Sequence, residues 1–301
     1  MGDQAQMLRA RMNQMSNRLT PPCHTARVIA VASGKGGVGK SNFCVNFALS
    51  LMSSGLRPIV IDTDVGFANV EVLLGVTPTY TILDLLNGKD IWEVIETSPA
   101  GLPFLSAGNG LLNLYSLTDA DVEKMVHELG QLHEKYDVIL LDSGAGMGTQ
   151  IGRLVSSADE LIVVTTPEPT SITDAYALVK MLAIRGELPI ARLVVNRVAR
   201  ISDGKSAAEK LQMVVERFLK VKIGVLGYIF EDEAVVRSVM AQEPLYLSFP
   251  NSRAANCYEQ LVKNYAVQRA DVPRTGLSGF IERLFKRSSH SGGGVDFIHP
   301  A

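Results

Sequence analysis

The chain has 301 residues, of which 47% are hydrophobic and 20% charged, so it can bury the core of a large α/β domain and lacks a disordered composition. Its 29 basic and 31 acidic residues give a formal net charge of −2, which provides no global bias toward nucleic acid. The three cysteines, Cys23, Cys44 and Cys257, form no Cys-x-x-Cys pair. This argues against a disulfide framework, a zinc site or an iron–sulfur site and favours a reducing cytoplasm.

From residue 27 onward, short apolar runs alternate with segments of helical character. Residues 1–26 are predicted to form a polar N-terminal arm and linker, because Pro21 and Pro22 interrupt any helix there. Apolar strand-like runs occur at residues 28–32, 58–61, 138–141, 161–164, 193–195 and 225–228, and helical segments at 43–53, 121–135, 172–184 and 206–219. This alternation predicts a doubly wound α/β domain over residues 27–267, with a mostly parallel sheet and helices on both faces.

A glycine-rich motif follows the first predicted strand and opens the next helix. It consists of Gly34, Lys35, Gly36, Gly37, Val38, Gly39, Lys40 and Ser41, which satisfies G-x-x-x-x-G-K-[ST] in the context that this motif requires. We expect backbone N–H groups to surround a phosphate, Lys40 to neutralise the β- and γ-phosphates, and Ser41 to bind Mg²⁺. A plain glycine-rich turn is the alternative, and the acidic residues further along the chain argue against it.

Two predicted strands end in acidic residues. Asp62 and Asp64 follow the strand at 58–61, and Asp142 follows the strand at 138–141. In a doubly wound sheet, ligands bind beyond the carboxyl ends of the strands, so these carboxylates are expected to face the phosphates. Asp142 is interpreted as a Walker B carboxylate directed toward Mg²⁺. Without the phosphate-binding motif, Asp62 and Asp64 would be read as turn-favouring residues at a strand end.

The glycine-rich motif resembles the deviant Walker A motif of the MinD/ParA/nitrogenase iron protein class, because it has a second lysine, Lys35, near its start. The resemblance implies that Lys35 reaches across a homodimer to the partner's nucleotide. Residues 62–64 are similar to the D-x-D switch I segment of this family, which implies that Asp64 orients the attacking water and that Asp62 supports the magnesium shell. ATP hydrolysis is then expected to be slow in an isolated chain and faster in a dimer.

Two later segments resemble the nucleobase pocket of the same family. Asn196 and Arg197 follow the predicted strand at 193–195, and the resemblance implies that Asn196 hydrogen-bonds adenine. Phe230, Glu231 and Asp232 lie in a loop that is expected to border the base. Because the chain has no Asn-Lys-x-Asp guanine motif, ATP and ADP are favoured over guanine nucleotides. A turn residue at a strand end is the alternative interpretation of Asn196.

Residues 64–70 and 168–180 look like the flagellar branch of the MinD-like ATPases, called FlhG or FleN, and the likeness covers residues 27–265. Residues Asp3–Arg9 match the D-Q-A-x-x-L-R element through which FlhG proteins stimulate the GTPase of FlhF, a partner of the signal-recognition type. On this match, Gln4 would enter the partner's active site. An unstructured arm is the alternative.

The end of the chain divides into three parts. Residues 268–276 are expected to form a linker and residues 288–301, rich in Ser and Gly, a disordered tail. Between them, residues 277–287 carry an apolar stripe at helical spacing with basic residues beside it: Leu277, Phe280, Ile281, Leu284 and Phe285, with Arg283, Lys286 and Arg287. The pattern suits a helix that binds anionic lipid, as the family resemblance implies, or a last helix packed on the protein's own surface. No apolar run approaches the roughly 20 residues of a transmembrane helix, so membrane contact is expected to be peripheral.

The motifs and the resemblance together predict a cytoplasmic, Mg²⁺-dependent ATPase that dimerises with ATP, associates reversibly with the inner face of the cell membrane, and regulates flagellar number and placement. FlhF, a flagellar transcription activator and flagellar C-ring proteins are the expected partners, and direct binding of nucleic acid is not expected. The alternatives are a partition-type ATPase that binds DNA, an iron–sulfur carrier, and a nucleotide-binding scaffold with little hydrolysis.

Overall fold

The computed structural model describes residues 26–64, 69–106, 118–146, 148–268 and 276–285. Within them, eight strands form one sheet in the order β3-β4-β2-β5-β1-β6-β7-β8. The strands are β1 (Arg27–Ser33), β2 (Pro58–Thr63), β3 (Glu96–Thr97), β4 (Pro103–Ser106), β5 (Val138–Ala145), β6 (Glu160–Thr165), β7 (Ile190–Val198) and β8 (Gly224–Phe230). Strand β3 runs antiparallel to β4, and the other neighbouring strands are parallel. The predicted doubly wound, mostly parallel sheet is confirmed.

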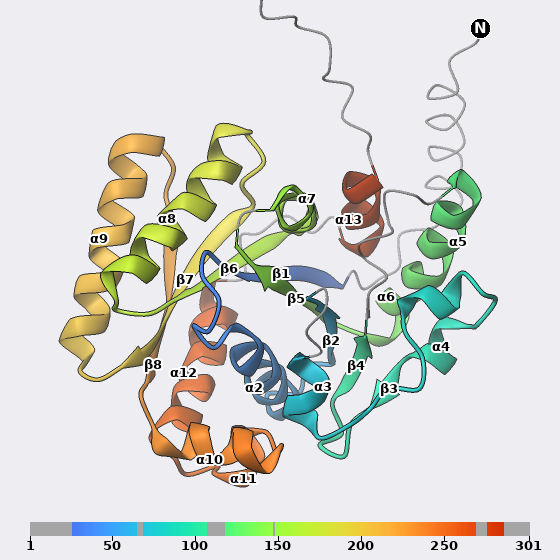
Figure 1. Ribbon diagram of the computed structural model, residues 1–301, viewed down its shortest axis with the longest axis horizontal. Helices are drawn as coiled ribbons and strands as arrows, with labels where there is room; N and C mark the ends of the chain where they lie inside the picture. Colours follow the sequence, from blue (N-terminus) through green and yellow to red (C-terminus); the bar gives the residue numbers. More distant parts are fainter. Residues whose placement is uncertain (1–25, 65–68, 107–117, 147, 269–275, 286–301) are drawn as a thin grey trace, which may run out of the picture.

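Helices cover both faces of this sheet (Figure 1). Against one face pack α2 (Lys40–Ser53), α3 (Asn69–Leu74), α10 (Glu233–Ala241), α11 (Leu245–Ser248) and α12 (Arg253–Gln268). Against the other face pack η1 (Ile82–Leu85), α4 (Ile91–Val94), α5 (Asp119–Gly130), α6 (Leu132–Lys135), α7 (Thr149–Ser157), α8 (Pro169–Ile184), α9 (Ile201–Leu219) and α13 (Gly276–Phe285). Alternate residues of β1 enter the two cores, with Val28 in one and Ile29 in the other, both fully buried. Two covered faces explain why the central strands are continuously apolar.

Two regions differ from the sequence-based expectation. The strands β3 and β4 were not predicted, because a two-residue and a four-residue strand are too short for a hydrophobic pattern to identify. Strand β4 is placed by pairing with β2, where Val60 lies opposite Phe104. The single helix predicted at 121–135 is two helices, since α5 ends at Gly130 and α6 begins at Leu132.

A buried ionic network ties the edge of the sheet that lies opposite the glycine-rich loop. Glu160 is fully buried at the start of β6 and pairs with Arg27 of β1, at 2.5 Å, and with Arg192 of β7. The hydroxyl of Tyr265 donates a third hydrogen bond to Glu160, at 3.2 Å. Arg192 also donates to the carbonyl of Gln268, the last residue of α12, at 2.9 Å. The C-terminus of α12 is therefore fixed to the sheet.

Helix α13 docks on the body with the apolar stripe that the sequence revealed. Leu277, Phe280 and Ile281 are 1%, 4% and 1% exposed and belong to the same core as α5 and α7. Arg283 donates to the carbonyl of Ser157 at 2.9 Å from Nε. In this structure, the helix is thus packed on the protein's own surface. None of the helices within the described ranges has the length and apolarity needed to span a bilayer.

Candidate active site

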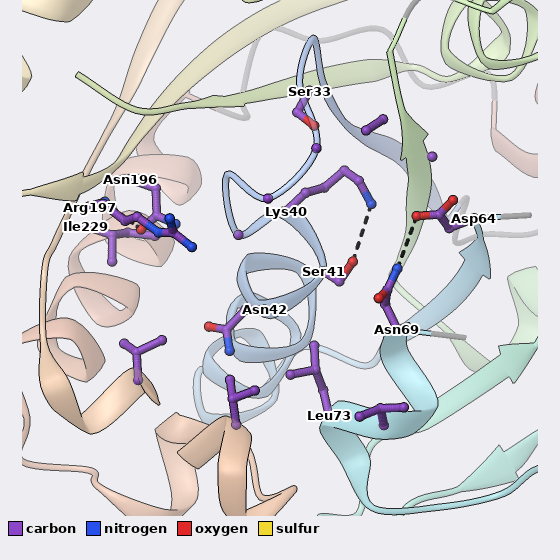
Figure 2. A pocket seen from close by; sticks show the side chains of 18 of the residues that line it. Ser33, Lys40, Ser41, Asn42, Asp64, Asn69, Leu73, Asn196, Arg197 and Ile229 are labelled. Carbon is purple, nitrogen blue, oxygen red and sulfur yellow. Dashed lines mark hydrogen bonds between the residues drawn. The ribbon is translucent and has the colours of Figure 1, made fainter. Parts of the chain in front are cut away.

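A cavity of about 1150 Å³ lies at the carboxyl ends of the central strands. Its walls come from the glycine-rich loop, the start of α3, the end of β5 and the segment after β8. In Figure 2, Asn196 and Arg197 lie on one side of Lys40, and Asp64 and Asn69 on the other. This location agrees with the rule that ligands of doubly wound sheets bind at the carboxyl edge.

The glycine-rich loop links Ser33, the last residue of β1, to Lys40, the first of α2. Gly37 and Gly39 have φ angles of +77° and +90°, a conformation that side chains with a Cβ rarely adopt. Gly34 is fixed for a different reason, because a Cβ there would lie 2.1 Å from the carbonyl oxygen of Asp174 in α8. The loop therefore curls tightly between the sheet and α8, and its N–H groups and the positive end of α2 favour an anion.

Lys40 forms a buried ion pair with Asp142. The Nζ–Oδ1 distance is 2.6 Å, and the two side chains are 6% and 0% exposed. Burial raises the pKa of the Asp142 carboxyl, while Lys40 counteracts this shift. The other oxygen, Asp142 Oδ2, is buried and has no hydrogen-bond partner among the described residues. An unpartnered buried carboxylate oxygen is costly, so this atom is suited to receive a water or a cation when ligand binds.

Asp62 lies beside Asp142 in the neighbouring strand and is 3% exposed. Its two oxygens are already engaged, since Oδ1 accepts from the N–H of Asp64 at 2.9 Å and Oδ2 from the N–H of Val70 at 3.1 Å. Asp62 therefore holds both ends of the 64–70 segment. Burial, and to a lesser extent the neighbouring Asp142, raises the pKa of Asp62 to about 7.

This shift predicts a pH dependence of stability in the nucleotide-free protein. The pKa of Asp62 is about 7 in the folded state against an ordinary 3.8, so between these values the folded protein holds a proton that the unfolded chain has lost. The stabilising contribution of Asp62 is thus present below pH ~4 and is lost as the pH rises to ~7. Urea unfolding across this window should give Asp62→Asn a flatter profile than wild type, by a difference on the order of a few kcal/mol.

The matched control for this measurement is Asp203→Asn. Hydrogen bonding to Arg200 lowers the pKa of Asp203 from its ordinary 3.8, so Asp203 titrates below the window. Its removal should leave the wild-type slope between pH 4 and 7. Equal slopes for wild type and Asp62→Asn would contradict the assignment of this pH dependence to Asp62.

The segment after Asp142 closes the cavity on the side of Asp64. The hydroxyl of Ser143 donates to the carbonyl of Val31 at 2.8 Å, and the N–H of Gly146 donates to the carbonyl of Ser33 at 3.0 Å. A Cβ at Gly144 would lie 3.1 Å from Asp64 Oδ1. The absence of a side chain at Gly144 lets the end of β5 approach Asp64.

At the opposite side, Asn196 connects β7 to the glycine-rich loop. Its Nδ2 donates to the carbonyl of Val38 at 2.8 Å, and its Oδ1 accepts from the N–H of Arg197 at 2.9 Å. Arg197 has a φ of +54° and also lines the cavity. Asn196 thus holds the glycine-rich loop, and its contact with adenine remains a prediction.

The end of β8 and the loop after it also line the cavity, through Phe230, Glu231 and Asp232, and their contact with a base remains a prediction. The Arg253 guanidinium stacks on the Phe230 ring, 3.5 Å from its centroid. Asp232 accepts hydrogen bonds from the N–H groups of Ala234 and Ala254, at 2.9 and 3.1 Å. Its carboxylate therefore caps α10 and the start of α12, a role that the sequence analysis did not identify.

Lys35 is placed differently from the rest of the motif. Its Nζ lies 3.4 Å from Glu168 Oε2, and both side chains are substantially exposed, at 44% and 59%. Lys35 is not among the residues that line the cavity, whereas Gly36, Gly37 and Lys40 are. The ammonium group of Lys35 therefore lies outside the cavity of its own chain, paired with Glu168.

Asn69 also lines the cavity, and the sequence analysis assigned it no role. Its Nδ2 donates to Asp64 Oδ2 at 3.1 Å (Figure 2). The only sequence signal was its place in the segment 64–70, which resembles the flagellar branch. Hydrogen bonding between these two residues depends on the path of the chain between them, which the sequence pattern does not specify.

The fold, the phosphate loop and the buried Lys40–Asp142 pair define a P-loop nucleoside triphosphatase. The ParA family model, described as "NUBPL iron-transfer P-loop NTPase", matches residues 24–266. The chain therefore belongs to the ParA/MinD family of P-loop ATPases. Within the described residues, Cys44 and Cys257 are buried free thiols, and no group of three potential metal ligands occurs there.

Curated relatives place the chain in the flagellar branch of this family. It is 36% identical to the antiactivator FleN of Pseudomonas aeruginosa over 263 residues, which cover 87% of this chain and 94% of FleN. It is 33% identical to the flagellum site-determining protein YlxH of Helicobacter pylori, over 86% of this chain and 90% of YlxH. Among solved structures, the MinC:MinD complex of Aquifex aeolicus matches with a TM-score of 0.64 and 27% identity, covering 82% of this chain and 98% of that one. These findings favour the flagellar reading over the partition-type alternative.

Proposed function

We propose that the protein is an ATP-dependent dimerising switch that regulates the number and placement of flagella. The observation that carries the dimerising switch is the position of Lys35, which belongs to the phosphate loop but lies outside the cavity of its own chain. Two relatives, the antiactivator FleN and the flagellum site-determining protein YlxH, support the flagellar role.

The proposed ligand is ATP or ADP with Mg²⁺. The hydroxyl of Ser41 lines the cavity, and Asp142 contributes the buried, unpartnered oxygen described above. Hard oxygen donors of this kind suit Mg²⁺, which keeps several of its waters. Ser41 would bind the cation, with Asp142 and Asp62 supporting its water shell. Bound Mg²⁺ would neutralise part of the negative charge on the phosphates.

ATP hydrolysis to ADP and phosphate is proposed to depend on three groups of this chain. Lys40 and the N–H groups of the glycine-rich loop stabilise negative charge on the phosphates, and Asp64 accepts a hydrogen bond from water and orients it for attack. No strong general base stands beside Asp64 among the described lining residues. Slow turnover in the isolated chain follows, and Lys35 of the partner subunit would complete the site in the dimer.

Expected partners follow from the branch to which the chain belongs. The segment Asp3–Arg9, which lies outside the described residues, is proposed to stimulate an FlhF-type GTPase. An antiactivator role, by analogy with FleN, would require binding of a flagellar transcription activator. Flagellar C-ring proteins are the third proposed partner.

The test of the flagellar role is a count of flagella in the native organism. Deletion of the gene should change the number of flagella per cell in electron micrographs, because the switch that limits assembly is lost. Wild-type protein should restore the count, and Asp64→Ala, expressed at the same level, should not. A deletion strain with the wild-type number and position of flagella would overturn the flagellar proposal.

Reversible membrane association through α13 is also proposed, and it requires α13 to leave its docked position. We expect the full chain with ATP and Mg²⁺ to float with vesicles that contain phosphatidylglycerol, and the ADP form to remain unbound. Phe280→Asp should abolish flotation, because it places a charge on the apolar face of the helix. Phe218→Asp, at a position of α9 that is 63% exposed, is the matched control and should float normally. Flotation that persists in Phe280→Asp would remove α13 as the anchor.

A further inference from the structure

The proposed nucleotide has a defined direction in the cavity. Its γ-phosphate must lie on the side of Asp64, the residue proposed to orient the attacking water. Figure 2 shows Asp64 and Asn196 on opposite sides of Lys40. Because the base is at the other end of the nucleotide, it must lie beyond Lys40, on the side of Asn196.

Phe230, the last residue of β8, lies on this side of the cavity. It is paired with Val198 of β7, two residues beyond Asn196, and the N–H of Glu231 donates to the carbonyl of Val198 at 3.1 Å. Of the described residues that line the cavity, two are aromatic, Phe230 and Tyr258. Tyr258 is 2% exposed, whereas Phe230 is only half-buried. Phe230 is therefore the more accessible aromatic ring for a base.

Arg253, the first residue of α12, covers one face of the Phe230 ring. The central carbon of its guanidinium lies 3.5 Å from the ring centroid, which is a cation–π contact. Phe230 lines the cavity and Arg253 does not. The guanidinium therefore lies behind the ring as seen from the cavity, and a base would stack on the opposite face.

The carboxylate of Asp232 fixes the backbone around this pair. It accepts from the N–H of Ala254, which follows Arg253, at 3.1 Å and from the N–H of Ala234 at 2.9 Å. The segment after Phe230 is thereby tied to the start of α12. Because the backbone sets the positions of the ring and the guanidinium, stacking costs less side-chain entropy.

We propose that Phe230 stacks on the nucleobase, with Arg253 as the positioning residue behind its ring, and that this stack supplies affinity for the base. The inference rests on the proposed binding of ATP and ADP. Every nucleobase has a π face, so an aromatic ring strengthens binding without distinguishing one base from another. Discrimination of adenine is then left to polar groups such as Asn196.

Calorimetric titration with Mg²⁺-ADP and with Mg²⁺-pyrophosphate tests the stack, because pyrophosphate has the two phosphates of ADP without the base. Phe230→Leu should weaken ADP binding roughly tenfold and leave pyrophosphate binding unchanged. Phe230→Tyr keeps the ring and should retain the wild-type affinity. Unchanged ADP binding in Phe230→Leu would overturn the proposal. An equal loss for both ligands would also overturn it, because the ring would then shape the phosphate site rather than contact the base.

Two further readouts follow from the same variant. GDP binding should weaken by the same factor as ADP binding, and a loss confined to ADP would mean that Phe230 discriminates between bases, contrary to the proposal. In ATP hydrolysis, the loss should appear in KM rather than in kcat, because the base is remote from the reacting phosphate. A fall in kcat with an unchanged KM would contradict the stack.

Arg253→Gln tests the positioning role at an exposed side chain. It should weaken ADP binding roughly threefold in the wild-type background and have no effect in the Phe230→Leu background, because it acts through the ring. An equal loss in both backgrounds would contradict this role. The matched controls are Arg237→Gln and Phe249→Leu, since the Arg237 guanidinium lies 4.9 Å from the Phe249 centroid and neither residue lines the cavity. Both controls should keep the wild-type affinity for ADP.

The same titrations distinguish failure of the inference from failure of the proposed function. A wild-type protein that binds neither ADP nor ATP would contradict the proposed function, and the stack with it. Binding of ADP that Phe230→Leu leaves unaltered would contradict the stack alone. Melting temperatures without nucleotide identify a variant that fails to fold, and Arg253→Gln then still tests the pair.

Discussion

Lys40→Ala is expected to destabilise the nucleotide-free protein as well as to abolish its activity. Asp142 is 0% exposed and forms an ion pair with Lys40 at 2.6 Å, so the substitution leaves a buried carboxylate without its cation. Breaking a buried pair in this way costs about 3–5 kcal/mol. In a domain of this size the melting temperature should fall by roughly 10 °C at neutral pH, as measured by calorimetry without nucleotide. ATP hydrolysis should fall by about 1000-fold, because the charge on the phosphates loses its main stabilising group.

The double variant Lys40→Ala/Asp142→Asn is the control for this explanation. Removing the carboxylate charge together with the ammonium should restore most of the lost stability while hydrolysis stays absent. The penalty of the single variant should also shrink at acidic pH, because a protonated Asp142 needs no counterion. A Lys40→Ala protein as stable as wild type at neutral pH would contradict the view that this ion pair stabilises the folded site.

The mass of the protein in solution should depend on the nucleotide. The chain of 32.6 kDa is expected to be monomeric with ADP and to dimerise with ATP and Mg²⁺. Asp64→Ala should remain dimeric long after wild type has returned to monomer, because hydrolysis is what ends the dimer. Lys35→Ala should not dimerise, because the side chain proposed to reach the partner's nucleotide is absent. Light scattering coupled to size exclusion measures all three.

Lys89→Ala is the matched control for Lys35→Ala. Lys89 is another partly exposed lysine, 3.3 Å from Glu93, and it lies outside the cavity lining. Its replacement removes a comparable surface ion pair and should leave the dimer intact. A mass that is indifferent to nucleotide in wild type would refute the switch. Normal dimerisation of Lys35→Ala would refute the role of that lysine alone.

The central sheet and the phosphate loop were predictable because their signals are local. Residues 28–32 are apolar without interruption, and the glycines that follow fit a motif of fixed spacing. Asp62 and Asp142 lie opposite each other near the carboxyl ends of β2 and β5, because parallel strands bring these ends together. Of the three predicted carboxylates, Asp64 lines the cavity and the other two lie buried behind it. Their individual roles as ligands remain proposals.

Other features of the site depend on contacts between distant segments. The capping of α12 by Asp232 joins residues 22 positions apart, and the bond from Asn196 to Val38 spans 158 positions. Neither contact has a sequence pattern of its own. The apolar stripe of α13 was recognised, but a stripe that binds lipid and a stripe that binds protein have the same spacing. Only the fold reveals the complementary surface beside α5 and α7.

The ionic network at the edge of the sheet opposite the glycine-rich loop limits how far α13 could move from its docked position. Arg192 anchors the last residue of α12, and α13 begins at Gly276, so only residues 269–275 join a fixed point to that helix. A covalent stretch of this length reaches roughly 25–30 Å at most. If α13 left its docked position, this short connection would keep the helix near its docking surface. The effective concentration of the helix at that surface would then be in the millimolar range. The membrane association proposed above therefore requires a lipid surface to compete with a docking surface that always stays close to the helix.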